Sequence, residues 1–415
     1  MAARQADPAQ RPGAGHAPAR RGCGQRQPGG AAGLGRHAVR LDRRRVLGGA
    51  LALALGQPAR PARAAPADTS LREAAARSGR HFGTAMRAEF LAAEPDLGAA
   101  TVAECSQLTP ELSMKWEAIA FHNGEANYAS ADALVRFARE NAMAVHGHTL
   151  LWHRSIPAWA ADALSTDGDW GVVARHIAAT VGRYRDTVAS WDVVNEPIDT
   201  GRRMDGLREG VLLSAFGPDY IRRALEAAGE AAPAARLFLN DYGLDYEIPV
   251  EKDRRYLLLK LAERLRAAGV PLHGVGIQAH LDLAKGPFDE RAFAGFLADL
   301  AALGLELRIT ELDVREQDYL APAPLRDRLI ADHVKRYLDV ALDCPAVRGV
   351  TTWGLSSRHS WLEIEPAALD FYWRVSAGQG PGPGFNRGLP FDSDMRPTPM
   401  REAILAALER RPLRV

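Results

Sequence analysis

Eight short runs of apolar and β-branched residues recur along the chain, and segments of helical periodicity separate them. The runs are 81–86, 105–109, 144–149, 190–195, 236–241, 274–278, 305–311 and 349–353. Apolar residues recur at helical spacing in 132–141, 172–184, 220–228, 254–268, 291–302 and 326–342. Eight strand-helix units in about 340 residues predict an α/β fold, a single closed (β/α)8 TIM barrel, with its site on the loops after the strands. An open, doubly wound sheet is the alternative.

The first 64 residues differ in composition from the rest. They hold 12 arginines and two aspartates, whereas residues 65–415 hold 40 basic and 49 acidic residues. The arginines at 43–45 precede an apolar run, 46–55, that is too short to span a bilayer, and Ala62-Arg63-Ala64 is typical of a cleavage site. We therefore predict that 1–64 form a disordered basic extension plus a twin-arginine-like signal peptide. The folded domain, 65–415, would then be exported to the periplasm or the medium.

The composition of residues 65–415 narrows the classes of function. Their acidic balance argues against nucleic acid as a partner, and after signal removal no membrane partner is expected. Cys105 and Cys344 could form one disulfide, but their apolar contexts are more typical of buried thiols. The chain has no phosphate-binding loop, dinucleotide fingerprint, nucleophile elbow or His-Glu-x-x-His motif. We expect a monomer with no cofactor and no metal.

Polar and aromatic residues lie at or just past the predicted strand ends: His148, Asn195, Glu196, Asn240, Asp241, Gln278, His280, Glu311 and Trp353. Glu196 and Glu311 each end an apolar run. Two carboxylates held by a rigid scaffold are what glycosidic bond cleavage needs, one as an acid and one as a base or nucleophile. Trp152, Trp353 and Trp361 offer flat surfaces for sugar rings. Carbohydrate hydrolysis is therefore the leading hypothesis.

Seven segments, in order, resemble glycoside hydrolase family 10, the retaining endo-β-1,4-xylanases built on a (β/α)8 barrel. They are 114–116, 147–153, 191–197, 240–242, 276–280, 309–313 and 353–354. The resemblance runs from about His81 to Leu408. It implies that 65–415 are a catalytic domain that hydrolyses β-1,4-xylosidic bonds in xylan or xylo-oligosaccharides by double displacement.

The resemblance also implies a role for individual residues. Glu196 would be the acid/base and Glu311 the nucleophile, supported by His280 and Asp313. The implied substrate-binding residues are Glu111, Lys115, His148, Trp152, Asn195, Tyr242, Gln278, Trp353 and Trp361. Among these, Asn195 would bind the 2-hydroxyl of the cleaved sugar, Tyr242 would face the leaving-group side and Trp361 would close over the subsite.

The chain departs from the family pattern at four positions. Leu112, Ser155, Gly243 and Ser357 stand where the family usually has Asn, Gln, Asn and Asp. Each lost hydrogen bond to a sugar would weaken transition-state binding by roughly 0.5 to 1.5 kcal/mol. We expect intact catalysis with a distal glycone subsite that is weakened or retuned to a different glycoside.

Other functions remain as alternatives. One is a related retaining β-glycosidase with a retuned distal subsite, and another is a non-catalytic carbohydrate-binding relative. The spacing of His146 and His148 is also typical of a barrel metallohydrolase, with His153, His273, His280 and Asp313 as further candidate ligands. A cellulase-like barrel also uses Asn-Glu-Pro, but it would not explain segments 114–116 and 276–280.

Overall fold

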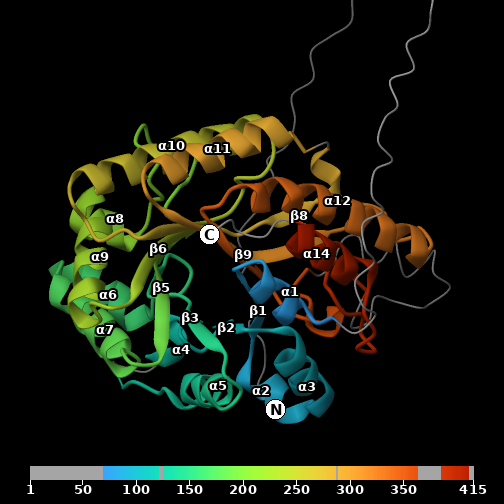
Figure 1. The fold of residues 1–415 in the computed structure, drawn as a ribbon. Coiled ribbons are helices and arrows are strands. Elements are labelled where there is room, and N and C mark those ends of the chain that lie inside the picture. Colours follow the sequence, from blue (N-terminus) through green and yellow to red (C-terminus); the bar gives the residue numbers. More distant parts are fainter. Residues whose placement is uncertain (1–68, 121–124, 287, 363–384, 411–415) are drawn as a thin grey trace, which may run out of the picture. The chain divides into compact units, whose positions relative to one another are not determined.

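A closed barrel of eight parallel strands forms the centre of the computed structural model, which describes residues 69–120, 125–286, 288–362 and 385–410 (Figure 1). The strands are β1 (His81–Met86), β2 (Gln107–Pro110), β3 (Ala144–Gly147), β5 (Val188–Asn195), β6 (Arg236–Asp241), β7 (Gly274–Ile277), β9 (Glu306–Arg315) and β10 (Val347–Thr352). Each pairs with the next, and β10 pairs with β1 to close the ring. The predicted barrel is confirmed, and the open sheet is wrong.

Two short strands extend the barrel on the side where the strands end. β4 (Leu151–Trp152) pairs with the end of β5, and β8 (His280–Asp282) pairs with the end of β9. The chain therefore stays extended beyond β3 and β7. This places the motif residues after each strand at the rim of the barrel.

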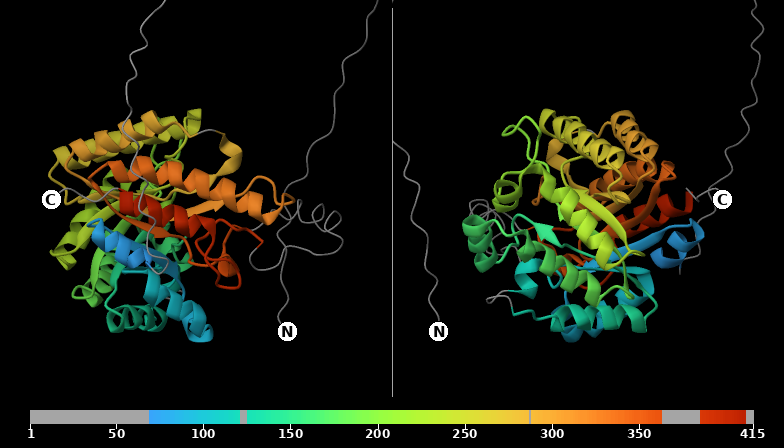
Figure 2. Two further views of the ribbon diagram at one scale, coloured as in Figure 1. Left: turned by 45° about the vertical axis from the view of Figure 1, so that its right-hand side comes forward. Right: turned by 90° about the vertical axis from the view of Figure 1, so that its left-hand side faces the viewer.

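Helices surround the barrel (Figure 1). They are α1 (Leu71–Arg77), α2 (Ala88–Ala93), α3 (Pro95–Glu104), α4 (Trp116–Ile119), α5 (Ala129–Glu140), α6 (Ala158–Asp167), α7 (Trp170–Arg183), α8 (Val211–Phe216), α9 (Tyr220–Ala231), α10 (Pro249–Ala267), α11 (Glu290–Ala302), α12 (Ala323–Asp343) and α14 (Pro399–Arg410), with 3-10 turns η1 (Gly217–Asp219), η2 (Leu283–Lys285) and η3 (Ser357–His359). The six helical segments expected from periodicity all form. The C-terminal α14 packs against α1 and α12 (Figure 2).

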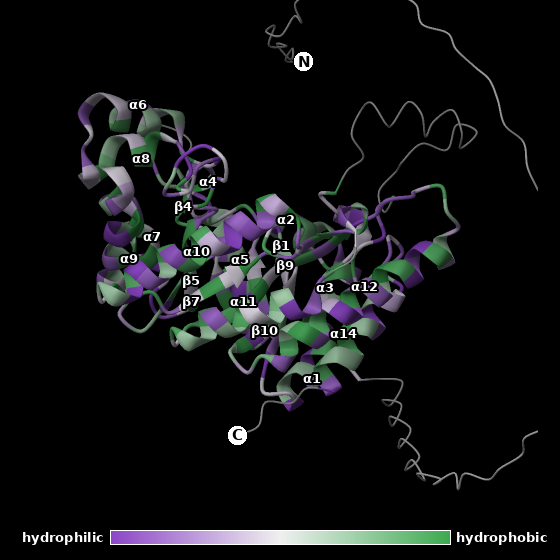
Figure 3. Cartoon of the chain, turned by 90° about the horizontal axis from the view of Figure 1, so that it is seen from above, coloured by the Kyte–Doolittle hydropathy of each residue, from purple (hydrophilic) through white to green (hydrophobic). Residues whose placement is uncertain are grey.

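Local sequence explains where several helices begin. Ser70 and Glu73 form a reciprocal capping box at the start of α1, and the Asp169 side chain caps α7. Pro249 opens α10, where its missing N–H removes no helical bond. Helices α10, α11 and α14 carry both hydrophilic and hydrophobic residues (Figure 3), as expected of an outer layer with one face on the barrel.

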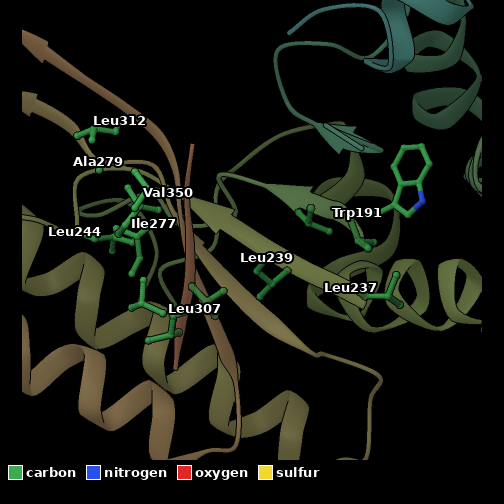
Figure 4. Packing of buried hydrophobic residues seen from close by; sticks show 14 of the residues in the cluster. Trp191, Leu237, Leu239, Leu244, Ile277, Ala279, Leu307, Leu312 and Val350 are labelled. Carbon is green, nitrogen blue, oxygen red and sulfur yellow. The ribbon is translucent and has the colours of Figure 1, made fainter. Parts of the chain in front are cut away.

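The main hydrophobic core lies between the barrel and the helices. Figure 4 shows Leu237, Leu239, Ile277, Leu307 and Val350, which are fully buried residues of β6, β7, β9 and β10. Because alternate residues of a strand point to opposite faces, the residues between them point into the barrel. The two faces of the barrel wall therefore differ in chemistry.

The interior of the barrel contains polar as well as aromatic groups. Arg308 donates to Ser190 Oγ over 2.7 Å, and its guanidinium lies 4.5 Å from the ring centre of Phe238. A Cβ at Gly274 would come within 2.2 Å of the Phe238 ring, and one at Gly276 within 2.2 Å of an amide oxygen. The two glycines of β7 therefore provide space for side chains from neighbouring strands.

The predictions for the N-terminal segment and for the two cysteines have different outcomes. The extension and signal peptide predicted for 1–64 lie outside the described residues and stay a prediction. Cys105 is buried, Cys344 is half-buried, and both are free thiols. Among the helices of the described ranges, none is long and apolar enough to cross a membrane.

Candidate active site

Twelve of the thirteen residues predicted for the site line one cavity of about 480 Å³ at the strands' C-terminal ends. They come from loops and strands spread over positions 111 to 361 of the sequence. Asp313 is the exception, because it is 1% exposed and lies behind His280. The structure therefore brings the predicted residues together.

Glu311 lies at the centre of a hydrogen-bonded cluster. Its Oε1 accepts a 2.7 Å bond from Asn240, and its Oε2 lies 3.2 Å from His280 Nε2. The other ring nitrogen of His280 lies 2.8 Å from Asp313 Oδ1, and Trp361 Nε1 donates to Asp313 Oδ2 over 2.6 Å. An imidazole thus connects two buried carboxylates.

Electrostatics in this cluster favour an ionised Glu311. Burial, the largest single effect, opposes ionisation. The hydrogen bond from His280 and the charges of His148, His280 and Lys115 together outweigh it and hold the pKa of Glu311 below its usual value. Burial would likewise lower the pKa of His280, yet the charge of Asp313, with a smaller contribution from Glu311, raises it to about 10. At neutral pH the cluster therefore contains a charged imidazolium and an available carboxylate.

Glu196 has a more open environment. It is 13% exposed, its Oε1 accepts a long 3.4 Å bond from Asn195, and its Oε2 lies 3.8 Å from His153 Nδ1. Burial and the charges of Arg208 and Arg154 lower the pKa of His153 to about 4. Above that pH the neighbouring imidazole is neutral, so Glu196 has no cation in close contact on this side.

Three amide side chains connect the two glutamates. Asn240 donates through Nδ2 to Asn195 Oδ1 over 2.9 Å as well as to Glu311, and Gln278 donates to the same Asn195 oxygen over 3.2 Å. These bonds orient the Asn195 Nδ2 group toward Glu196. The amide network leaves Asn195 with an oriented donor at the cavity.

Another part of the cavity wall combines a cation with aromatic rings. The Nζ of Lys115 lies 4.5 Å from the ring centre of Trp152 and 5.8 Å from that of Trp353. Burial lowers the pKa of Lys115, an effect opposed by nearby carboxylates, first among them Glu311. This wall can stack on the apolar face of a sugar and donate to its hydroxyls.

His146 in β3 and His148 just after it share one buried carboxylate. His146 and His148 both contact Asp192 Oδ2, at 3.0 and 2.8 Å. Among the described residues, no group of three or more His, Cys, Asp or Glu side chains could hold a metal ion. The described residues therefore offer no metal site for a metallohydrolase.

Known proteins resemble the chain over most of its length. The family described as "Glycosyl hydrolase family 10" matches residues 70–407. The chain belongs to this family. Among its relatives are Endo-1,4-beta-xylanase 3 of Hypocrea jecorina, 34% identical over 312 residues (74% of this chain, 80% of the relative), and Endo-1,4-beta-xylanase B of Thermotoga neapolitana, 33% identical over 315 residues (74% and 81%).

Solved structures of the family have the same fold. Native xylanase 10B from Thermotoga maritima matches with a TM-score of 0.69 and 32% identity, covering 82% of this chain and 98% of that one. Xylanase 10B from Thermotoga petrophila, solved in complex with xylobiose, gives the same values. This chain is a family 10 glycoside hydrolase.

The four departures from the family 10 pattern differ in their positions. Gly243 lines the main cavity and has a φ of +61°. Leu112 lines a second cavity of about 180 Å³. Ser155 and Ser357 are both buried, and the Ser357 hydroxyl has no hydrogen-bond partner within the ranges that the structure describes. Direct effects on a ligand are therefore expected at the first two positions.

Sequence reasoning missed five charged residues that line the cavity, Arg154, Arg208, Asp282, Lys285 and Arg315. It named a sixth lining residue, His153, only as a candidate metal ligand. Most lie at or just beyond the end of a strand, and that position is the sequence signal that could have identified them. Arg208 is different, because it lies 12 positions after Glu196 in the loop before α8. Only the folding of that loop brings it back to the site.

Proposed function

We propose that the chain is an endo-1,4-β-xylanase that cleaves xylan with retention of configuration. One observation carries the proposal. Glu311 is buried in surroundings that favour its ionised form, Glu196 is less buried, and a network of amide side chains connects the two. The two carboxylates have different environments, as an acid and a nucleophile require. Relatives named as xylanases support the substrate class.

In the first step the ionised Glu311 attacks the anomeric carbon of the sugar. A bond forms from its carboxylate to that carbon while the bond to the leaving oxygen breaks, and Glu196 gives its proton to that oxygen. The hydrogen bond from His280, with the charges of His148 and Lys115, favours the charged form of Glu311 before attack. The products are a glycosyl ester on Glu311 and a shortened xylan chain.

In the second step water hydrolyses the ester. Glu196, now a carboxylate, takes a proton from water as the oxygen attacks the anomeric carbon, and the bond to Glu311 breaks. Both carboxylates then regain their starting protonation states. Asn195, oriented by Gln278 and Asn240, is placed to donate to a sugar hydroxyl throughout.

The second candidate function is a related retaining β-glycosidase whose distal glycone subsite accepts a different sugar. One ion pair favours it. Arg87 donates to Glu111 over 2.5 Å, so the carboxylate expected to bind a distal sugar already has a cationic partner. Arg87 also lines the second cavity together with Leu112. A distal sugar would meet this pair and an apolar side chain. Comparing rates on aryl xylobiosides and xylosides tests this, and a strong preference for the xylobioside would contradict it.

The test of the main proposal is product release from xylan by the purified protein and by its Glu311→Gln variant. We expect xylo-oligosaccharides from the wild type and none from the variant. If the wild type releases nothing but still cleaves an aryl xyloside, the second candidate is favoured. No cleavage of either substrate by a folded wild type supports a non-catalytic carbohydrate-binding protein instead.

We also propose that 1–64 direct export by the twin-arginine route and that the mature protein acts as a monomer. The arginines at 43–45 and the apolar run after them support export. Cell fractionation of the wild type and of a variant with lysines at all three positions tests the route. Light scattering of the exported protein tests the monomer, and a mass of two chains or more would contradict it.

A further inference from the structure

The loop that follows Glu196 folds back on itself as a hairpin. Ile198 and Leu207 form an antiparallel bridge, and the Arg208 N–H donates to the carbonyl of Pro197 over 2.8 Å. This hairpin returns Arg208 to the segment that contains Glu196. We propose that Arg208 is a positioning residue for the acid/base Glu196, an inference that rests on the function proposed above.

Glu196 has a backbone conformation that needs external support. Its φ is +56°, in the left-handed region that non-glycine residues rarely adopt. Such conformations persist where the surrounding structure fixes them. The Glu196 N–H donates to the carbonyl of Asn240 over 2.7 Å, and the Glu196 carbonyl accepts a 2.8 Å bond from Arg208 Nε. The peptide groups on both sides of Glu196 are therefore held.

Arg208 binds several groups around Glu196 at once. Its Nη2 donates to the carbonyl of Ile198 over 2.8 Å and to the hydroxyl of Tyr242 over 3.1 Å. The side chain is only 12% exposed, and its Nη1 lies 3.6 Å from a carboxylate oxygen of Asp199. The planar guanidinium thus fixes two carbonyls two residues apart, which a flexible ammonium group cannot reproduce in the same geometry.

A second set of contacts holds Ile198 independently of Arg208. Arg254 donates to the Ile198 carbonyl over 2.6 Å, and Asp241 accepts from its N–H over 3.0 Å. Among the described side chains, however, the hydrogen-bond donor to the Glu196 carbonyl is Arg208 alone. Loss of Arg208 should therefore release the carbonyl of Glu196 while most of the loop stays anchored.

The consequence should depend on the leaving group. A catalytic group displaced by about 1 Å can lose roughly 100-fold in rate. Glu196 protonates the leaving oxygen in the first step, but a dinitrophenolate departs without a proton. The second step still needs Glu196 as a base to deprotonate the attacking water. Azide can replace water as the nucleophile, and it needs no base because it is already an anion. A misplaced acid/base therefore slows the cleavage of xylan more than that of a dinitrophenyl glycoside, and azide restores part of the lost rate. A general loss of binding produces neither effect, and we call these two effects the leaving-group and azide signature.

The experiment compares four variants of the full chain with the wild type. Arg208→Met removes the N–H donors of the side chain. Arg208→Lys keeps the positive charge but lacks the planar guanidinium that reaches both carbonyls. Glu196→Ala provides the reference signature. Arg203→Met is the matched control, because Arg203 lies in the same hairpin, pairs with Asp205 at 2.7 Å and is 39% exposed. Each protein is assayed on xylan and on dinitrophenyl β-xylobioside, with and without azide.

We expect both Arg208 variants to lose about 10- to 100-fold in kcat/KM on xylan, less for lysine than for methionine. Their kcat/KM on the dinitrophenyl substrate should stay near the wild-type value, and azide should raise kcat. Equal losses on both substrates without an azide effect, or wild-type values, overturn the inference. If Arg208→Met does not fold, Arg208→Lys decides by the same criteria.

The controls separate failure of this inference from failure of the proposed function. A wild type that cleaves neither substrate overturns the proposed function and this inference with it. If Glu196→Ala lacks the leaving-group and azide signature, the role proposed for Glu196 is wrong. If Glu196→Ala shows the signature and the Arg208 variants do not, only the positioning role of Arg208 fails.

Discussion

Replacing Asp313 by asparagine tests the charged cluster beneath Glu311. Asp313 is 1% exposed, lies 2.8 Å from His280 Nδ1 and accepts a 2.6 Å bond from Trp361. Asparagine has nearly the same shape and can still accept from the indole, but it carries no charge. The substitution therefore removes the electrostatic partner of His280 with little change in packing.

The size of the effect follows from the pKa of His280. A rise from 6.5 to about 10 corresponds to roughly 5 kcal/mol of stabilisation of the imidazolium. Asp313 contributes the largest of the interactions that raise this pKa. Breaking a buried ion pair by removing one partner typically costs about 3 to 5 kcal/mol. We expect Asp313→Asn to lower the free energy of unfolding by that amount near pH 6.

The pH dependence has a definite sign. A histidine whose pKa is raised in the folded state contributes its stabilisation in full below its unfolded pKa of 6.5, and the contribution disappears as the pH rises through about 10. The difference between the wild type and Asp313→Asn should therefore be largest near pH 6. It should shrink above pH 10.

Urea unfolding at both pH values measures the difference, and an NMR titration of the His280 ring measures its pKa. Asp339→Asn is the control, because Asp339 lies in a partly exposed pair with Lys335, and such pairs contribute about 0 to 1 kcal/mol. A wild-type His280 that titrates near its unfolded value would refute the reasoning. So would a stability difference that is the same at both pH values.

Two further substitutions test the distal subsite and the barrel wall. Leu112→Asn restores an amide beside Glu111, and we expect it to raise the kcat/KM ratio of xylobioside to xyloside by about 2- to 10-fold, the value of one hydrogen bond; an unchanged ratio would remove this position from the subsite. Gly147→Ala would place a methyl group 2.2 Å from the buried ring of Trp191. We expect a loss of about 1 to 3 kcal/mol in unfolding free energy by urea titration, and wild-type stability would contradict the packing.

Local sequence pattern was sufficient for the barrel and for the residues at the strand ends, whereas Glu111 and Tyr242 were predicted for the site only from the resemblance to family 10. Strands β1 and β6 form at the predicted residues, because a short apolar run bounded by segments of helical periodicity is recognised from neighbouring positions alone. Motif residues at strand ends lie together because parallel strands end on the same side of a barrel. Glu196 and Glu311 are separated by 115 positions, yet both line one cavity for this reason.

Tertiary structure decided the features that depend on pairs of distant side chains. β9 runs on to Arg315, beyond its predicted end, because β8 pairs with its last residues. The ion pair of Arg87 with Glu111 and the return of Arg208 to Glu196 depend on how loops fold, which local periodicity does not encode. The sequence by itself determined which strand-end residues meet at the rim of the barrel. Folding decided how each is charged, paired and held, because burial and contact set those properties.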